Sequence, residues 1–245
     1  MEIISTKQLN DSRAEAIISL VEKASLIDGI EYEAIVDTEA DSESELYVLA
    51  YDKLELIGYL NVFFGVPSEL AGLIHPDYRR KGIMMSLYEA VRESLDSRFE
   101  LSGHDDFPGF KEFARKLNCE DSYHEYLMEY DHDFSAEFEP VEFETEATED
   151  NAEDFTFKDE TGRIIGHIGL AHEGSLVNIF NVYVEPEYRN MGNGRRMLLT
   201  MLNEVDDGDS IVLQVSEKNQ AALRLYLKCG FNIISSVLYY CNHVE

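Results

Sequence analysis

The chain has 245 residues, of which 20 are Lys or Arg and 49 are Asp or Glu, so its formal net charge is −29. Such an acidic protein repels a phosphate backbone, which excludes nucleic acid as an expected partner. Apolar residues make up 44% of the chain, enough to build packed cores, which excludes extended disorder. The negative field favours a cationic, amine-bearing partner, but the same charge would serve solubility alone, and charge by itself leaves both explanations open.

The cysteines and the opening segment predict a reduced, cytoplasmic protein. Cys119, Cys229 and Cys241 are odd in number and have no paired spacing, which is typical of free thiols and not of a disulfide framework or metal site. The opening segment, MEIISTKQLNDSRAEA, lacks the basic stretch and apolar core of a signal peptide. No apolar run approaches the roughly 20 residues that span a bilayer, so we expect no membrane partner.

An internal repeat organises the chain, because segment 74–91 matches segment 184–201. Four pairs of identical residues stand at one common offset: Pro76 and Pro186, Tyr78 and Tyr188, Arg79 and Arg189, Gly82 and Gly192. Upstream, LIGYL (56–60) resembles IIGHI (164–168). The repeat predicts two copies of one α/β unit, with domains at 1–132 and 133–245.

The first copy is expected to begin with a helix from Asn10 to about Leu26, followed by a first matched strand from about Leu46. Leu20, Val21, Ala24 and Ser25 fit one side of that helix. Between Tyr130 and Phe155, nearly half of the residues are Asp or Glu. This segment is too charged for a buried helix and predicts a strand with a loop.

The second copy predicts the order β-β-β-α-β-α-β, a mixed sheet flanked by helices. Its expected elements are a hairpin at 155–159 and 163–172 with its turn at Glu160–Gly162, a strand at 176–186, a helix from Arg195, a strand at 211–215, a helix from Asn219 to Cys229, and a strand at about 232–240. In the first helix, Met197, Leu198, Met201, Leu202 and Val205 form one apolar stripe. In the second, Asn219 is a suitable N-cap and Gly230 the expected left-handed residue after the end. Ala222, Leu225, Tyr226 and Cys229 form the buried face of this second helix, and Cys229 is expected to be packing.

A glycine-bearing loop lies between the strand at 176–186 and the following helix. Glycines allow consecutive backbone N–H groups to point at one spot, and the helix adds its positive N-terminus, so Arg189–Gly194 can hold a pyrophosphate. Arg189, Arg195 and Arg196 all stand at this junction in a chain with 20 basic residues. An ordinary tight turn is the competing interpretation, and the clustered arginines favour anion binding.

The segments VYVEPEYRNMGNGRRML (182–198) and LQVSEKNQAALRLYLKCGF (213–231) resemble the GNAT superfamily of acyl-CoA-dependent N-acyltransferases. The resemblance covers nearly all of residues 155–240. It implies an α/β (α+β) fold of two tandem GNAT-like domains, each a mixed, mostly antiparallel sheet flanked by helices. It also implies acetyl-CoA as co-substrate and an amine as acceptor.

The resemblance further implies roles for individual residues. Backbone groups of Val182, Tyr183 and Val184 would contact the pantetheine arm. The pyrophosphate would be cradled by Arg189, Asn190, Met191, Gly192, Asn193, Gly194 and Arg195. Asn219 would contact the cofactor, and Tyr226 would protonate the departing thiolate. Tyr226 also lies on the apolar stripe of its helix, so a role in the core stays open.

The general base is not identified. The segment 178–189 resembles the branch of the family that acetylates ribosomal-protein N-termini, in which a Glu stands at the position of Gln214, and Gln cannot accept a proton. Glu173, His172 and His167 are substitutes that could act through water, although each is also explained as a surface residue.

The first copy is eroded. Met84 stands where the family has Gly or Ala, Ala114 stands in the position of Tyr226, and Asn118 stands in that of Gly230. Asn tolerates the left-handed conformation, so the helix end can survive, but the acid is lost and catalysis there is not expected. The second copy lacks the opening helix that would wall an acceptor site, so its cleft is open to a large acceptor or is covered by the first domain.

The sequence therefore predicts an N-acetyltransferase that moves acetyl from acetyl-CoA to a primary amine by direct attack. The acceptor is expected to be a small cationic molecule or a peptide N-terminus. A CoA-binding regulatory or structural module with little turnover is the alternative.

Overall fold

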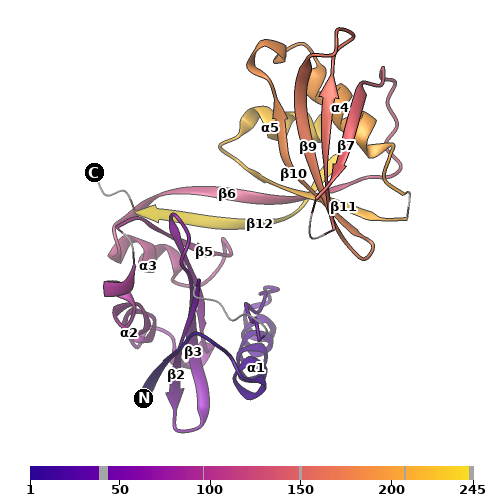
Figure 1. Cartoon of the computed structure of the whole chain (residues 1–245). Helices are drawn as coiled ribbons and strands as arrows, with labels where there is room; N and C mark the ends of the chain where they lie inside the picture. The colour runs from indigo at the N-terminus through magenta and orange to yellow at the C-terminus, as the bar shows by residue number, and fades with distance from the viewer. Residues whose placement is uncertain (39–43, 96, 149–150, 207, 243–245) are drawn as a thin grey trace. The chain divides into compact units, whose positions relative to one another are not determined.

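The computed structural model describes residues 1–38, 44–95, 97–148, 151–206 and 208–242 (Figure 1). They divide into two compact units, Met1–Tyr123 with Val237–Glu245, and His124–Ser236. The sequence predicts domains at 1–132 and 133–245, whereas the two units of the structure divide after Tyr123, and Val237–Asn242 joins the first unit.

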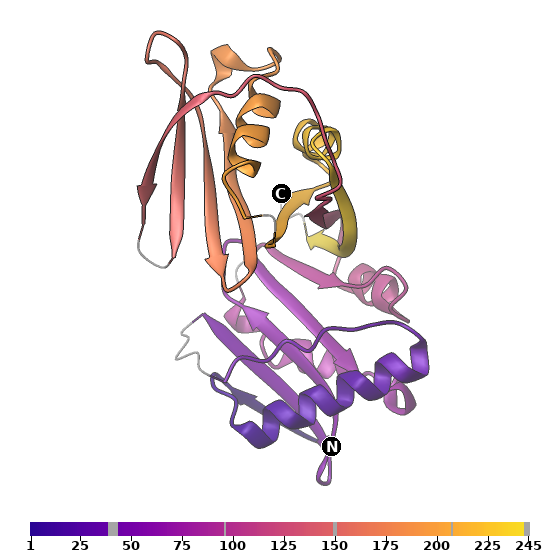
Figure 2. The ribbon, with the colours of Figure 1, turned by 90° about the vertical axis from the view of Figure 1, so that its right-hand side faces the viewer.

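The first unit is a sheet with helices on both faces (Figures 1 and 2). Its elements are β1 (Glu2–Thr6), α1 (Asp11–Asp28), β2 (Glu45–Asp52), β3 (Glu55–Phe63), β4 (Ser68–Ile74), α2 (Ile83–Glu89), β5 (Phe99–Gly103) and α3 (Phe110–Lys116). The strand order is β1-β2-β3-β4-β5-β12, in which β12 (Phe231–Asn242) comes from the end of the described chain, and the β4–β5 pair is parallel. One face packs on α1, and the other packs on α2 and α3. Strand β1 was not predicted from the sequence.

Helix α1 follows directly from its sequence. The Asn10 side chain accepts a hydrogen bond from the Arg13 amide at 2.9 Å and caps the start, and Gly29 ends the helix in the left-handed conformation at φ 68°. The buried residues repeat at helical spacing: Ala14, Ile17, Leu20, Val21 and Ala24. The expected helix is confirmed, and it extends past Leu26 to Asp28.

The second unit contains a second mixed sheet. Its own elements are β7 (Glu142–Ala147), β8 (Ala152–Lys158), β9 (Ile164–Glu173), β10 (Leu176–Val184), α4 (Asn193–Leu202), β11 (Ser210–Ser216) and α5 (Gln220–Lys228). The strand order is β6-β11-β10-β9-β8-β7, and only the β10–β11 pair is parallel among the described pairings of this unit. The expected order of elements is confirmed, and β7 is the strand predicted in the acidic segment.

Two long strands, β6 (Cys119–Tyr130) and β12 (Phe231–Asn242), contribute residues to both units (Figure 1). The Glu125–Glu129 part of β6 pairs antiparallel with β11, and the Leu238–Cys241 part of β12 pairs antiparallel with β5. The last strand of each sequence copy therefore completes the sheet of the other copy. This exchange changes the boundary between the two units from the one that the repeat predicts. A repeat in the sequence does not specify whether the last strand of a copy pairs with its own sheet or with the sheet of the other copy.

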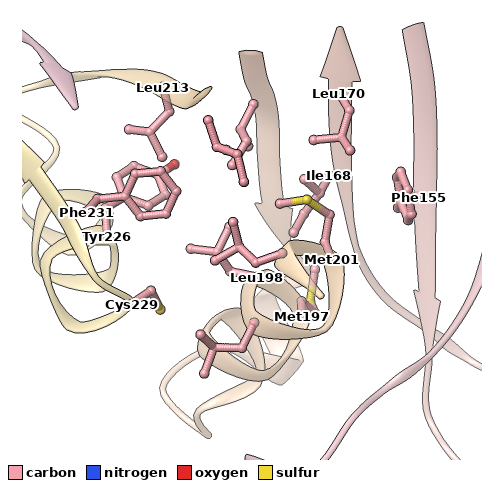
Figure 3. Close-up of a cluster of buried hydrophobic side chains, with 14 of the residues drawn as sticks. Phe155, Ile168, Leu170, Met197, Leu198, Met201, Leu213, Tyr226, Cys229 and Phe231 are labelled. Carbon is pink, nitrogen blue, oxygen red and sulfur yellow. The ribbon is translucent and has the colours of Figure 1, made fainter. Parts of the chain in front are cut away.

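The core of the second unit lies between its sheet and the two helices α4 and α5 (Figure 3). Met197, Leu198, Met201 and Leu202 are buried, as the apolar stripe predicts, whereas α4 ends before Val205. Tyr226 of α5 and Cys229, which directly follows the helix, are buried beside Phe231. All three cysteines are buried as reduced thiols, as expected. Among the described residues, no helix is long and apolar enough to cross a membrane.

Candidate active site

The two parallel strands of the second unit separate partway along their length. Pairing between β10 and β11 runs from Leu176 with Ser210 to Ile179 with Leu213, and no pair is formed beyond this point in the described residues. A β-bulge follows between Phe180 and Tyr183, at which Asn181 has φ 49°. Beyond the bulge, β10 pairs only with β9 among the described pairings, so its backbone groups from Val182 to Val184 face an opening between β10 and β11.

The glycine-bearing loop lies at the end of β10 and leads into α4. A single 3-10 turn at Pro186–Tyr188 is followed by Asn190 at φ 61° and Gly192 at φ 83°. In the part of the chain that the structure describes, no side chain caps the start of α4, so the first-turn amides lack a side-chain acceptor. A Cβ at Gly192 would meet no atom within 4 Å. The loop therefore presents open space to a set of N–H donors at a helix N-terminus, where an anion is stabilised.

The three arginines of this loop have different environments. Arg189 is exposed, its Nε donates to the Val184 carbonyl at 2.8 Å, and its guanidinium carbon lies 5.3 Å from the centre of the Tyr183 ring. The Arg195 Nη1 donates to the Glu137 carbonyl at 3.4 Å, and the Arg196 Nε donates to the Glu139 carbonyl at 3.1 Å. Arg195 and Arg196 thus also hold the acidic segment that precedes β7, while Arg189 has the most freedom to meet an anion.

A tyrosine holds the loop to the β8–β9 turn. The Tyr188 hydroxyl donates to the Asp159 carboxylate at 2.8 Å. Hydrogen bonds from the Thr161 hydroxyl, the Arg163 amide and the Tyr188 hydroxyl hold the pKa of Asp159 well below its usual range, and the Asp159 carboxylate raises the pKa of Tyr188. The hydrogen bond between Tyr188 and Asp159 therefore fixes the position of the loop against the β8–β9 turn.

Tyr226 projects from α5 into the core of the second unit. Its ring centre lies 6.0 Å from that of Phe231, and Figure 3 shows the hydroxyl at the end of the ring away from Cys229. Burial raises the pKa of Tyr226 to about 12 and that of the Cys229 thiol to about 11. Both groups keep their protons at neutral pH, which a general acid requires.

Asn219 caps α5, as predicted. Its Oδ1 accepts a hydrogen bond from the Ala222 amide at 3.2 Å. The side-chain oxygen is therefore engaged in the helix cap, and a contact with a cofactor would use the side-chain NH₂ group.

The three candidate bases lie on β9, and Gln214, which cannot accept a proton, lies on β11. Gln214 is exposed on β11, where it pairs with Leu127, and Glu173 is exposed at the end of β9. His167 is half-buried, shares a hydrogen bond of 3.1 Å with the Thr156 hydroxyl and pairs with Tyr183 across the strands. His167 therefore lies nearer than Glu173 to the bulged part of β10, and His172 pairs with Val177 well before the bulge.

The first unit repeats the loop with altered surroundings. The Arg79 Nε donates to the Ile74 carbonyl at 3.1 Å, and Gly82 has φ 81°, as at Arg189 and Gly192. The Arg79 guanidinium, however, forms a bidentate ion pair with Asp28, at 2.7 and 2.6 Å, which no sequence pattern indicates. Ala114 is fully buried and supplies no acid, and Asn118 adopts φ 57°, as expected for the end of its helix.

The residues present fit the anionic group that the sequence suggests. Open space at Gly192, uncapped amides at α4 and an exposed Arg189 are the features that a pyrophosphate needs. The opening between β10 and β11 adds backbone groups of β10 that have no β11 partner among the described pairings and that could meet an amide-bearing arm.

Part of this chain is similar in sequence to known acetyltransferases. A family model described as the acetyltransferase (GNAT) family matches residues 112–231. An uncharacterized N-acetyltransferase, YitH of Bacillus subtilis, is 36% identical over 89 residues, which are 36% of this chain and 30% of the relative. The N-alpha-acetyltransferase RimI of Mycobacterium tuberculosis is 32% identical over 74 residues, which are 29% of this chain and 46% of the relative. The chain thus spans less than half the length of these curated relatives.

Solved structures share the fold over the whole chain. A GCN5-related N-acetyltransferase from Sphaerobacter thermophilus has a TM-score of 0.69 at 16% identity, covering 98% of this chain and 95% of that one. A tandem GNAT protein from the clavulanic acid biosynthesis pathway has a TM-score of 0.61 at 14% identity, covering 98% and 97%. At such identities the likeness shows the fold alone. The family model thus matches just under half of the chain, and the solved structures show that the chain shares its fold with a tandem GNAT protein.

Proposed function

We propose that the second unit transfers the acetyl group of acetyl-CoA to a primary amine. The observation that carries the proposal is the uncapped N-terminus of α4 beneath Gly192, which opens beside the separated strands β10 and β11. An anionic pyrophosphate is stabilised there by backbone donors and the helix dipole. The acetyl-CoA would enter with its phosphates at Arg189–Arg195 and its arm along Val182–Val184.

The reaction would be a direct attack. The neutral amine nitrogen forms the new C–N bond to the thioester carbonyl carbon, and the C–S bond breaks. Tyr226 gives its proton to the leaving sulfur, because its pKa of about 12 keeps it protonated until the thiolate develops. The proton of the attacking amine leaves to water or to a nearby base such as His167.

The acceptor would approach the face of the sheet opposite α4 and α5. Leu213 faces the core, so Gln214, one residue further along β11, faces the other side. Tyr183 and His167 pair across β10 and β9 and share the face of Gln214. Among the described residues of this unit, both α4 and α5 pack on the core face, which supports an accessible acceptor site for a small cationic amine or a peptide N-terminus.

Release of free thiol tests the proposal. The protein is incubated with acetyl-CoA and a mixture of primary amines, and the thiol and the acetylated products are measured. Arg189→Ala should weaken CoA binding and turnover, whereas Arg115→Ala, an exposed arginine on α3, should change neither. Equal effects of the two substitutions would contradict the assignment of the site.

A CoA-binding module with little turnover is the second candidate, favoured by Gln214 in the position of a base. Binding of CoA to the second unit without thiol release, for every amine in the mixture, would support this candidate and overturn the proposed transfer.

A further inference from the structure

The first unit encloses a cavity of about 600 Å³, a size typical of small-molecule sites. Pairing between β4 and β5 ends at Ala71 with Ser102, and the cavity lies where these strands separate, between α2 and α3. Its walls are mostly apolar, and they include Leu70, Met84, Met85, Leu101, Phe110 and Phe113. No sequence pattern predicted a cavity in the eroded copy.

Three differences separate this cavity from the opening in the second unit. Met84 lines the cavity at the position where the second copy has Gly194, so a side chain fills the place of a close backbone approach. Arg79, the equivalent of Arg189, is bound to Asp28. Ala114 replaces the proton-donating hydroxyl of the second copy. Gly82 keeps the open space of Gly192 at the start of α2, but the cavity lacks an unpaired arginine in the place of Arg189, a small residue in the place of Gly194 and a hydroxyl in the place of Tyr226.

The charged residues that line the cavity indicate the charge of the ligand that it could bind. Arg80 and Lys116 line it and are exposed, so they stand at its mouth, and Glu112 is the one acidic residue among the described lining residues. Since Asp28 neutralises Arg79, the lining carries a net charge of about one positive unit in a chain of net charge −29. A single anionic group would be held at the mouth, and an apolar body would fill the interior.

We propose that the first unit binds an apolar chain carrying one anionic group, a medium-chain carboxylate, and binds it without chemical change. The carboxylate lies between Arg80 and Lys116, and the chain extends between Met84 and Phe113 toward Leu70. The site is separate from the acetyl-CoA site proposed for the second unit, and either assignment can fail without the other.

The chain contains no tryptophan, so a single introduced tryptophan is a unique fluorescent reporter. Phe113→Trp places it on the cavity wall, and Leu54→Trp places one on the exposed β2–β3 turn of the same unit as a control. Decanoate, at concentrations where it is monomeric, should change the emission of the first variant and not of the second. Each methylene added from hexanoate to decanoate should tighten binding by up to about 4-fold, because each buried methylene contributes about 0.8 kcal/mol.

Charge variants test the head group in the Phe113→Trp protein. Lys116→Glu should weaken decanoate binding about 10-fold or more, whereas Lys111→Glu, on the same helix but outside the cavity lining, should leave it unchanged. Decanol that binds as tightly as decanoate would overturn the anionic head group. Acetyl-CoA that changes the reporter emission at micromolar concentration would overturn the distinction from the second unit.

The unsubstituted protein provides an independent readout. A ligand that binds only the folded state raises the unfolding temperature, and the rise grows with ligand concentration. Decanoate should raise that temperature and decanol should raise it less. The decanoate concentration is set far above the dissociation constant measured by fluorescence. If the unfolding temperature of the unsubstituted protein does not change there, the proposal is overturned, because the introduced tryptophan itself would then have created the binding.

Discussion

Arg79 and Asp28 form a two-pronged ion pair in the first unit, with Nη1 to Oδ1 at 2.7 Å and Nη2 to Oδ2 at 2.6 Å. The two side chains are only 16% and 8% exposed, and the Tyr32 hydroxyl also donates to Asp28 at 2.9 Å. The equivalent Arg189 is exposed, and its side-chain Nε donates to the Val184 carbonyl. One arginine of the repeat therefore holds its unit together, and the other remains accessible to an anion.

This difference predicts losses of stability of unequal size when either arginine is replaced. Arg79→Ala leaves the Asp28 carboxylate without its partner in a mostly buried place, so it should lower the free energy of unfolding by about 3 kcal/mol. Arg189→Ala removes an exposed side chain and should cost less than about 1 kcal/mol. Denaturant unfolding measures both, and equal losses would show that the ion pair contributes nothing specific.

The same pair predicts a pH dependence. The hydrogen bonds from Arg79 lower the pKa of Asp28, so folding favours the ionised carboxylate. A lowered folded-state pKa contributes stability that is complete above the unfolded value near 3.8 and is lost as the pH falls through the folded value. The difference in unfolding free energy between the wild type and Asp28→Asn should therefore be constant from pH 7 to about pH 5 and should shrink in more acidic solution. A difference that grows with acidity would contradict the assignment.

Periodicity and end signals predicted the local elements well. The apolar stripe of α4, the Asn219 cap and the left-handed Gly230 at φ 91° all depend on neighbouring residues in the chain. The loop at Gly192 was predictable for the same reason. The roles of Asn219 and Tyr226 toward the cofactor, implied by the family resemblance, stay predictions.

Contacts between distant residues could not be read from the sequence. The exchange of β6 and β12 depends on pairing between strands that lie far apart along the chain, for example Glu125 with Ser216. The ion pair between Asp28 and Arg79 joins a helix near the start of the first unit to a loop that follows its fourth strand. The cavity of the first unit arises from the separation of β4 and β5, and no single motif encodes it.

Gly192 offers a test of the cofactor loop. Its φ of 83° is one that Asn tolerates, and a Cβ there meets open space, so Gly192→Asn should fold normally and keep most of its CoA affinity. Gly192→Glu places a negative charge beside the pyrophosphate. Like charges about 4 Å apart repel by about 4 kcal/mol at an effective dielectric constant of about 20, so binding should fall by roughly 100-fold or more. Calorimetry measures the affinity and circular dichroism the fold. Normal CoA binding by the Glu variant would place the site elsewhere.

Tyr226 is expected to act as the acid. Tyr226→Phe keeps the ring in the core and removes the proton, so CoA affinity should hold while kcat falls by roughly 10²- to 10⁴-fold. Because the pKa of Tyr226 is raised to about 12 by burial, the wild-type rate should show no alkaline fall from this group below about pH 11. Cys229→Ala removes the buried thiol at the end of α5 and should leave turnover intact. An unchanged kcat in the Phe variant would assign Tyr226 to the core alone.

The acceptor is expected to be a small cationic molecule with a weakly basic amine. The amine must be neutral to attack, which at neutral pH costs about 4–5 kcal/mol for a lysine-like amine of pKa near 10.4 but only about 1 kcal/mol for an α-amine of pKa near 8. The acidic surface gathers cations, yet nearby carboxylates also raise the pKa of a bound amine, and Gln214 accepts no proton. An α-amino group, an amino sugar or an amino acid derivative is therefore favoured over a lysine side chain. The value of kcat/KM should rise only to about pH 8, and Gln214→Glu should move that rise to lower pH by supplying a base. A rise that continues past about pH 9.5, with lysine-type substrates preferred, would contradict this prediction.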